Sequence, residues 1–215
     1  MTAFGDVREQ WGLPRALWSR VAGALRPWML IARVRIRAVE PEMLRQFPTA
    51  PGIEIREATE DELSRAAAAM PAALSSSFVI AARARGDVCA AAFDGPAMLS
   101  FSWFSFSEAP GPDGTIVEFS NPYRYIYKSY TRDEYRGMRL QQPVLFALDA
   151  EHLTKGYTHT IGYVETHNYA SINAGVAAGA QWVGYAGYLR CFGRILAFRS
   201  PGARRHSFCF RSGLA

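Results

Sequence analysis

The sequence predicts an α/β (α+β) domain preceded by a helix–strand extension. The chain has 215 residues, enough for one domain of this class. Its 49% hydrophobic and 20% charged residues are typical of a globular protein. Short segments of alternating apolar and polar residues, typical of strands, are interrupted by segments with helical periodicity. We expect an N-terminal extension over residues 1–51, the compact domain over 52–199 and a C-terminal tail over 200–215.

The extension is predicted to contain a helix and then a strand. Residues 1–27 read as a helix, because apolar side chains fall near helical spacing at Trp11, Leu13, Leu17, Val21 and Leu25. The tryptophans fit either a helix packed on the domain or contact with a membrane surface. Residues 29–39 alternate apolar residues with arginines, which predicts a half-buried strand. A proline-rich connector follows over 41–52.

The first half of the compact domain is predicted to be rich in strands. Residues 53–56 form a strand, and Thr59 with Glu62 makes a capping box that opens a helix ending near Pro71. Further strands are expected at 77–83 and 88–93, joined as a hairpin by the turn at 85–87, and at 99–106, followed by a loop at 108–115.

The second half is predicted to contain the central strand, over residues 123–130. Alternation places Tyr123, Tyr125, Tyr127 and Ser129 on one face and Tyr130 on the other. An amphipathic helix is expected over 141–155 and a short helix over 168–179. The remaining strands are expected at 159–164, 182–191 and 195–198.

Residues 130–140 are the most informative segment of the chain. An aromatic strand runs into an Arg136-Gly137 turn, and the amphipathic helix begins immediately afterwards. Such a layout directs several backbone N–H groups and the positive end of a helix dipole at one point. It therefore predicts a phosphate-binding turn.

Composition argues against several classes of function. The net charge of +5 is mild and the basic residues are scattered, so we expect no nucleic-acid partner. Cys89, Cys191 and Cys209 are odd in number and far apart, which favours free thiols in a reducing compartment. No run reaches the ~18 apolar residues of a membrane span. We expect a cytoplasmic protein without a metal site.

Three local features together resemble the GNAT superfamily of acyl-CoA-dependent N-acyltransferases. They are the turn Asp133–Gly137, the pair Gly156-Tyr157 followed later by Asn168-Tyr-Ala-Ser171, and the segment Ala178–Gly184. The resemblance covers roughly residues 53–198 and the predicted order of elements. It implies a mixed, mostly antiparallel central sheet flanked by helices, and an acyl-CoA co-substrate.

The resemblance also implies which residues bind the acyl-CoA. They are Tyr130, Thr131, Arg136, Gly137, Met138, Arg139, Leu140, Gln141, Asn168 and Ser171. Arg139 stands where the family has a glycine, and Gln141 where it has a small residue. Their side chains must point away from the ligand, unless Arg139 contacts a phosphate oxygen. Pro143 requires the helix to begin near Gln141.

The catalytic residues are less defined. Many family members have a tyrosine general acid seven residues after the asparagine, and here that position is Gly175. Glu118, Glu165 and His167 are the candidate general bases, and Tyr125 is the tyrosine expected to contact substrate.

The expected function is direct transfer of an acyl group from acetyl-CoA, or a related acyl-CoA, to a primary amine of a small metabolite. A transferase of the same fold with a longer acyl or an aminoacyl donor is an alternative. A non-catalytic acyl-CoA-binding or interaction module is another. A homodimer is compatible with all three.

Overall fold

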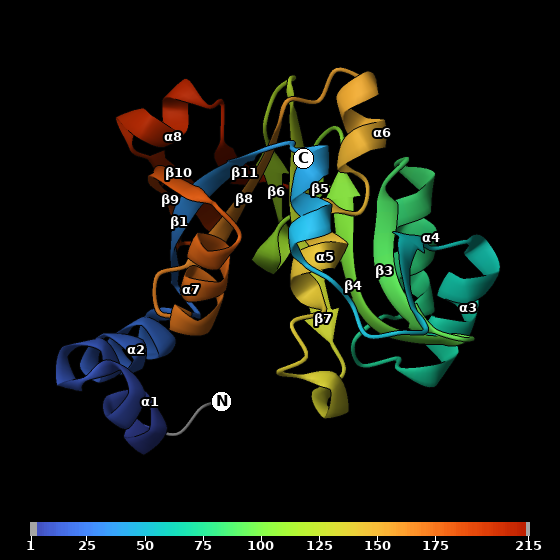
Figure 1. Ribbon diagram of the computed structural model, residues 1–215. Coiled ribbons are helices and arrows are strands. Elements are labelled where there is room, and N and C mark those ends of the chain that lie inside the picture. The colour runs from blue at the N-terminus through green and yellow to red at the C-terminus, as the bar shows by residue number, and fades with distance from the viewer. Residues whose placement is uncertain (1–3, 214–215) are drawn as a thin grey trace. The chain divides into compact units, whose positions relative to one another are not determined.

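A computed structural model describes residues 4–213, and the chain divides into two compact units. Unit 1 comprises Met1–Arg37, Glu108–Ser120 and Ile161–Ala215, and unit 2 comprises Ala38–Ser107 and Asn121–Thr160. The ends of the predicted extension and tail, residues 1–3 and 214–215, lie outside the described residues. Figure 1 labels elements of both units where there is room.

Unit 2 is built on an antiparallel sheet with helices beside it. Its strands are β2 (Ile53–Glu57), β3 (Val88–Asp94), β4 (Ala97–Ser105) and β7 (Tyr123–Thr131), in the order β7-β4-β3-β2. Its helices are η1 (Pro41–Gln46), α3 (Glu60–Ala69), α4 (Ser76–Ala84), η3 (Asp133–Tyr135), α5 (Gln141–Phe146) and α6 (Asp149–Thr154). The predicted fold class, a mixed α/β domain with a mostly antiparallel sheet flanked by helices, is confirmed.

Both faces of the unit 2 sheet are covered by apolar side chains. On one face Phe101 and Trp103 of β4 belong to a cluster with Leu63 of α3. On the other face Phe104 clusters with Val144 of α5. The turn that precedes α5 is therefore anchored to the core through the helix.

The predicted strand at 77–83 is wrong, because these residues belong to α4. The Ser75 hydroxyl accepts a hydrogen bond from the Phe78 N–H at 3.3 Å and so caps the helix. Val79 and Ala82, three residues apart, are the buried positions, as expected for one face of a helix. Tertiary packing overrides the β-branched composition of this segment.

The predicted helix over 141–155 is interrupted, and α5 and α6 are separate. Leu148, between them, has φ −106° and ψ 15°. The Leu148 carbonyl accepts a hydrogen bond from Arg124 at 3.3 Å, and the adjacent Asp149 carboxylate is ion-paired to the same guanidinium. The buried guanidinium of Arg124, from β7, thus bonds both the carbonyl and the carboxylate at the break.

Arg124 is the centre of a buried polar cluster in unit 2. Its side chain is fully buried, as are those of Asp149 and His152. Besides the ion pair with Asp149, the guanidinium donates to Thr160 Oγ1 at 2.9 Å and to His152 Nδ1. Burial, with Arg124 nearby, lowers the pKa of His152 to about 4, so this imidazole is neutral.

The His152 imidazole makes stability depend on pH. The unfolded chain takes up this proton near pH 6.5 and the folded protein only near pH 4, so stability falls as pH drops through that window. We expect the free energy of unfolding to fall by about 2 kcal/mol between pH 7 and pH 5 from this group. Urea unfolding at the two pH values measures it. His152→Gln should show a smaller fall, and an identical fall in both proteins would contradict the assignment.

The central strand β7 contains a bulge that the alternation pattern does not predict. Lys128 has φ +45°, and the pairs Trp103–Tyr127 and Phe101–Tyr130 leave two residues of β7 opposite one of β4. Tyr130 consequently packs against the same cluster as Tyr127. The expected placement of Tyr130 on the opposite face is wrong.

The same bulge moves Ser129 to the other face of β7. Its hydroxyl lies 2.8 Å from the hydroxyl of Ser102 in β4. The predicted grouping of Ser129 with Tyr123, Tyr125 and Tyr127 is therefore wrong for this residue.

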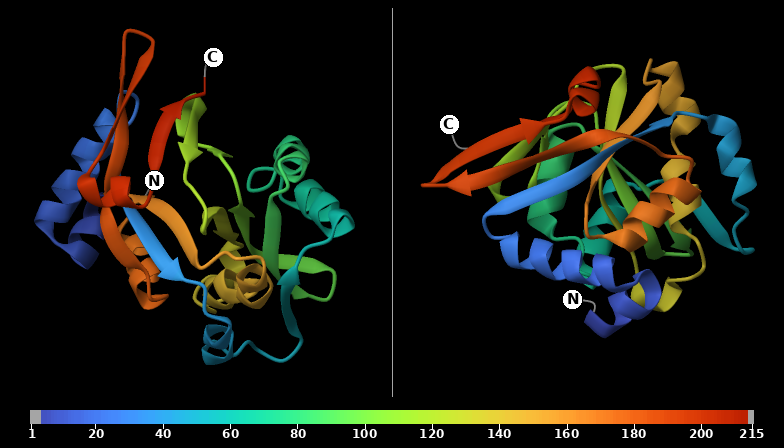
Figure 2. Two further views of the ribbon diagram at one scale, coloured as in Figure 1. Left: turned by 90° about the horizontal axis from the view of Figure 1, so that it is seen from above. Right: turned by 90° about the vertical axis from the view of Figure 1, so that its left-hand side faces the viewer.

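Unit 1 combines segments from both ends of the chain. Strand β1 (Met29–Ala38) pairs antiparallel with β9 (Gln181–Cys191), which pairs with β10 (Arg194–Arg199), and most of β8 (His159–Glu165) lies on the other side of β1. A small sheet contains β5 (Ala109–Pro110), β6 (Thr115–Glu118) and β11 (Cys209–Ser212). Its helices are α1 (Phe4–Trp11), α2 (Leu13–Leu25), η2 (Pro112–Gly114), α7 (Tyr169–Ala177) and α8 (Pro201–Arg205). Figure 2 gives two further views.

The N-terminal segment is helical, as predicted, although two helices replace the expected one. Gly12, with φ +84°, separates α1 from α2. The strand that follows is β1, and residues 201–212 of the expected tail supply α8 and β11. The predicted domain boundaries stay a prediction.

None of the helices within residues 4–213 has the length and apolar character to cross a membrane.

Candidate functional site

The turn between β7 and α5 has the backbone conformation expected for a phosphate-binding turn. Gly137 has φ +87° and Arg139 has φ +56°. Arg139, which stands where the resemblance expects glycine, therefore adopts the left-handed conformation that glycine adopts most easily. Helix α5 begins at Gln141, so Pro143 lies in its first turn, where a proline is tolerated.

Several N–H groups of this turn have no partner among residues 4–213. They belong to Gly137, Arg139, Leu140 and Gln141. Neighbouring main-chain N–H donors without partners of their own can bind an anion by hydrogen bonds. Because α5 has only six residues, its dipole contributes less than the predicted fifteen-residue helix would.

Gln141 points its side chain at the strands. Its Oε1 accepts from Ser100 Oγ at 3.1 Å and from Thr131 Oγ1 at 3.3 Å, while its Nε2 donates to Ser102 Oγ at 2.5 Å. The amide therefore fixes the start of α5 to β4 and β7 and leaves the turn open. Ser100 and Ser102 were not among the predicted site residues, although their alternation within an aromatic strand is a signal for them.

The other predicted residues of the turn differ in exposure. Arg136 is 65% exposed and ion-paired to Asp133 at 2.7 Å. Met138 is also exposed, whereas Leu140 is buried. Tyr130 packs its ring on Phe101, with 5.8 Å between the ring centroids. Arg136 and Met138 are thus accessible to a ligand, and Leu140 anchors the turn.

A cavity of about 200 Å³ lies beside the turn, within unit 2. Residues 46–49, at the end of η1 and just after it, form one wall, and Met138, Arg139 and Pro143 form the other. Phe47 in this wall stacks on Phe146 of α5, with 5.2 Å between ring centroids. The lining combines apolar side chains with the guanidinium of Arg139, which suits a ligand with both anionic and apolar groups.

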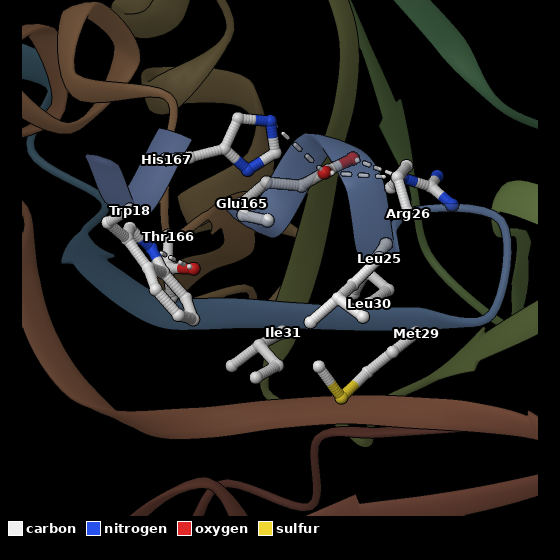
Figure 3. A pocket seen from close by; sticks show the side chains of 10 residues that line it. Trp18, Leu25, Arg26, Met29, Leu30, Ile31, Glu165, Thr166 and His167 are labelled. Carbon is white, nitrogen blue, oxygen red and sulfur yellow. Dashed lines mark hydrogen bonds and ion pairs between the residues drawn. The ribbon is translucent and has the colours of Figure 1, made fainter. Parts of the chain in front are cut away.

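A second group of polar side chains lies at the end of β8 in unit 1 (Figure 3). The Glu165 carboxylate forms an ion pair with Arg26 Nε at 3.3 Å. His167 Nε2 lies 3.8 Å from the same carboxylate. Trp18 Nε1 donates to Thr166 Oγ1 at 3.2 Å. The hollow that these residues line measures about 10 Å³, room for about one water molecule. The structure thus brings together two of the three predicted bases.

The remaining two catalytic candidates lie elsewhere. Glu118, at the end of β6, is ion-paired to Arg211, and its carboxylate accepts a hydrogen bond from Cys209 Sγ at 3.2 Å. Tyr125 is only 2% exposed and stacks on Tyr127 with 5.7 Å between ring centroids. Glu118 is thus held by an ion pair, and Tyr125 is a buried wall of the unit 2 core.

Asn168 and Ser171 form the expected helix entry in unit 1. Asn168 is the N-cap of α7, and its Oδ1 accepts from the Ser171 N–H at 3.1 Å. Further along α7, a Cβ added to Gly175 would lie 2.5 Å from Arg35 Nη1. The guanidinium of Arg35 therefore occupies the space that a tyrosine at position 175 would need.

Comparison with known proteins identifies the fold. No protein-family model matches the sequence, and no curated protein matches it. Among solved structures, a protein of the GNAT family from Novosphingobium aromaticivorans has a TM-score of 0.52 at 15% identity, covering 80% of this chain and 66% of its own. A Drosophila protein has a TM-score of 0.52 at 11% identity, covering 84% of this chain and 58% of its own. The chain therefore has a GNAT-like fold and spans less than two thirds of either protein.

Proposed function

We propose that this protein is an acyl-CoA-dependent N-acyltransferase that acts on a primary amine of a small metabolite. The unpartnered N–H groups of the left-handed turn at 137–141 support the proposal, because main-chain donors grouped in one turn are the kind of site that binds a pyrophosphate. The cavity of about 200 Å³ beside Arg139 has room for a part of coenzyme A next to its pyrophosphate. Acetyl-CoA is the expected donor, and a longer acyl or an aminoacyl donor is the alternative.

The proposed reaction is direct attack of the amine on the thioester carbonyl. The carbon–nitrogen bond forms, the carbon–sulfur bond breaks, and the amine loses a proton while the thiolate gains one. We assign the base role to His167 and Glu165, which lie together at the end of β8. A backbone N–H near Thr131, at the end of β7, is the proposed donor to the developing oxyanion. Asn168 and Ser171 remain proposed cofactor contacts.

One observation favours a second candidate function. Residue 175 is a glycine with Arg35 filling the space beside it, so α7 supplies no tyrosine hydroxyl at that position to protonate a leaving thiolate. A non-catalytic acyl-CoA-binding or interaction module needs no such group. This alternative shares the turn and the cavity, and it differs in releasing no thiol.

Acetyl-CoA should raise the melting temperature. At a hundred times the dissociation constant, a ligand of the folded state adds about 2.7 kcal/mol, or roughly 5–10 °C for a chain of this size. Arg139→Gly preserves the left-handed turn and removes the guanidinium. We expect it to weaken acetyl-CoA binding about tenfold, because one charge-assisted contact is lost. Titration calorimetry measures the affinity.

Each outcome of these measurements has a distinct meaning. No thermal shift at millimolar acetyl-CoA would remove the cofactor assignment, and tighter binding by Arg139→Gly would show that the guanidinium blocks the turn. Thiol release with a panel of primary amines separates the enzyme from the binding module. In that assay His167→Gln should lower turnover without changing acetyl-CoA affinity, and unchanged turnover would exclude His167 as the base.

A further inference from the structure

Helix α2 of unit 1 exposes an apolar face. Leu13, Leu17 and Val21, spaced four residues apart, are 49%, 52% and 48% exposed. The opposite face makes the packing contacts, since Ala16 is fully buried and Trp18 hydrogen-bonds to Thr166. The buried side of α2 thus already holds the helix on unit 1. Folding of unit 1 does not account for the exposed apolar side chains on its other face.

Two further exposed aromatic side chains stand on the segments of unit 1 that follow α2 and join β9 to β10. Trp28, just before β1, is 59% exposed, and its carbonyl accepts a hydrogen bond from the Arg190 N–H of β9 at 2.6 Å. Two residues beyond Arg190, Phe192 sits at the tip of the β9–β10 hairpin and is 99% exposed. We call Leu13, Leu17, Val21, Trp28 and Phe192 the apolar strip. The ribbon of helix α2 and of the β9–β10 hairpin is drawn in the right panel of Figure 2.

Both the backbone conformation and the exposure of Phe192 are energetically unfavourable. The two turn residues Phe192 and Gly193 both have positive φ, at 49° and 73°. Hairpin turns of this type favour Asn-Gly, and a bulky residue with positive φ is strained. Its ring is also fully hydrated. A strained and exposed aromatic side chain at a hairpin tip indicates a functional requirement.

The surroundings of the apolar strip are basic. Neither α2 nor the segment Gln181–Arg199 contains an acidic residue. The exposed arginines on these elements and on α1 include Arg8, Arg15, Arg20, Arg190 and Arg194. They outnumber the nearby carboxylates, which are Asp6 and Glu9 of α1 and Asp113, which interacts with Arg190. A second copy of the chain would bring like charges together, whereas an anionic lipid surface would complement them.

We propose that the apolar strip docks unit 1 on an anionic lipid bilayer. The leucines, Val21 and Phe192 enter the boundary between headgroups and acyl chains, and Trp28 takes the interfacial position that tryptophan prefers. The surrounding arginines contact lipid phosphates. In this kind of docking the helix α2 lies parallel to the membrane plane, and no spanning segment is required.

Sedimentation with lipid vesicles tests the proposal. The protein should bind vesicles of phosphatidylglycerol and phosphatidylcholine in equal parts, bind vesicles of phosphatidylcholine alone much less, and lose binding as salt rises. Phe192→Asn removes the ring and supplies the residue that the turn prefers, so its melting temperature should not fall. The double variant Leu17→Ser/Phe192→Asn should partition about tenfold or more weakly.

The matched control is Ile80→Ser, which removes an apolar side chain that is 70% exposed on α4 of unit 2. It should bind the mixed vesicles as the unsubstituted protein does. Absence of binding to the mixed vesicles overturns the proposal, as does an equal loss in Ile80→Ser. Self-association in sedimentation velocity that the double variant abolishes, without vesicle binding, would identify the strip as an interface between copies.

Discussion

Replacing Arg124 by methionine should destabilise the protein by about 3–5 kcal/mol, because it leaves the Asp149 carboxylate buried without its positively charged partner. The substitution also removes the donors to Thr160, His152 and the Leu148 carbonyl. Those groups cannot turn to solvent, since the cluster is closed by packing that includes Phe104 under the guanidinium. Urea unfolding followed by circular dichroism measures the change.

The double variant Arg124→Met/Asp149→Leu is the matched control for this prediction. Removing both charges eliminates the unpaired carboxylate, so the double variant should be more stable than Arg124→Met alone. If the single variant instead unfolds like the unsubstituted protein, the buried ion pair contributes nothing, and the explanation of the break between α5 and α6 fails with it.

Gly202→Ala should cost about 3 kcal/mol or more, because α8 lies directly on the backbone of β9. A Cβ at Gly202 would meet the Val183 carbonyl oxygen and carbon well inside the distances that side chains tolerate, and Gly184 Cα lies close by. All three neighbours are main-chain atoms, so no rotamer change can relieve the clash. The helix must move off the strand, and α8 should lose protection in hydrogen exchange.

A second glycine gives the control. Gly23 lies within α2 and has no atom within 4 Å of an added Cβ. Gly23→Ala should therefore stabilise the protein by up to ~1 kcal/mol through helix propensity. Both variants are measured by thermal and urea unfolding. Equal effects of the two substitutions would contradict the close approach of α8 to β9.

Features that depend on local sequence were predictable. The capping box at Thr59 and Glu62 forms as expected, and the Arg56 hydrogen bond lowers the pKa of Glu62 to about 2. The strands β1, β2, β3, β4 and β7 form close to the residue ranges predicted for them. Pro143 places the start of α5 correctly, because proline is tolerated only in the first turn.

Features that depend on distant residues were not predictable in the same way. The segment 77–83 reads as a strand by composition, yet α4 forms because its apolar face packs on the sheet. The break near Leu148 follows from Arg124, twenty-four residues away in sequence. In the candidate site, the turn conformation was expected from Gly137, whereas the bonds of Gln141 to Ser100 and Ser102 require knowledge of strand pairing.

The pairing of β1 with β9 constrains when the chain can fold. Met29 lies opposite Leu189, and Ile36 opposite Gln181, so these hydrogen bonds close a very long loop. During synthesis, β1 leaves the ribosome long before its partner exists. It must wait, with an unsatisfied edge, until the last segments emerge. A nascent chain stalled before Gln181 could complete unit 2, whereas the sheet of unit 1 would still lack two of its strands.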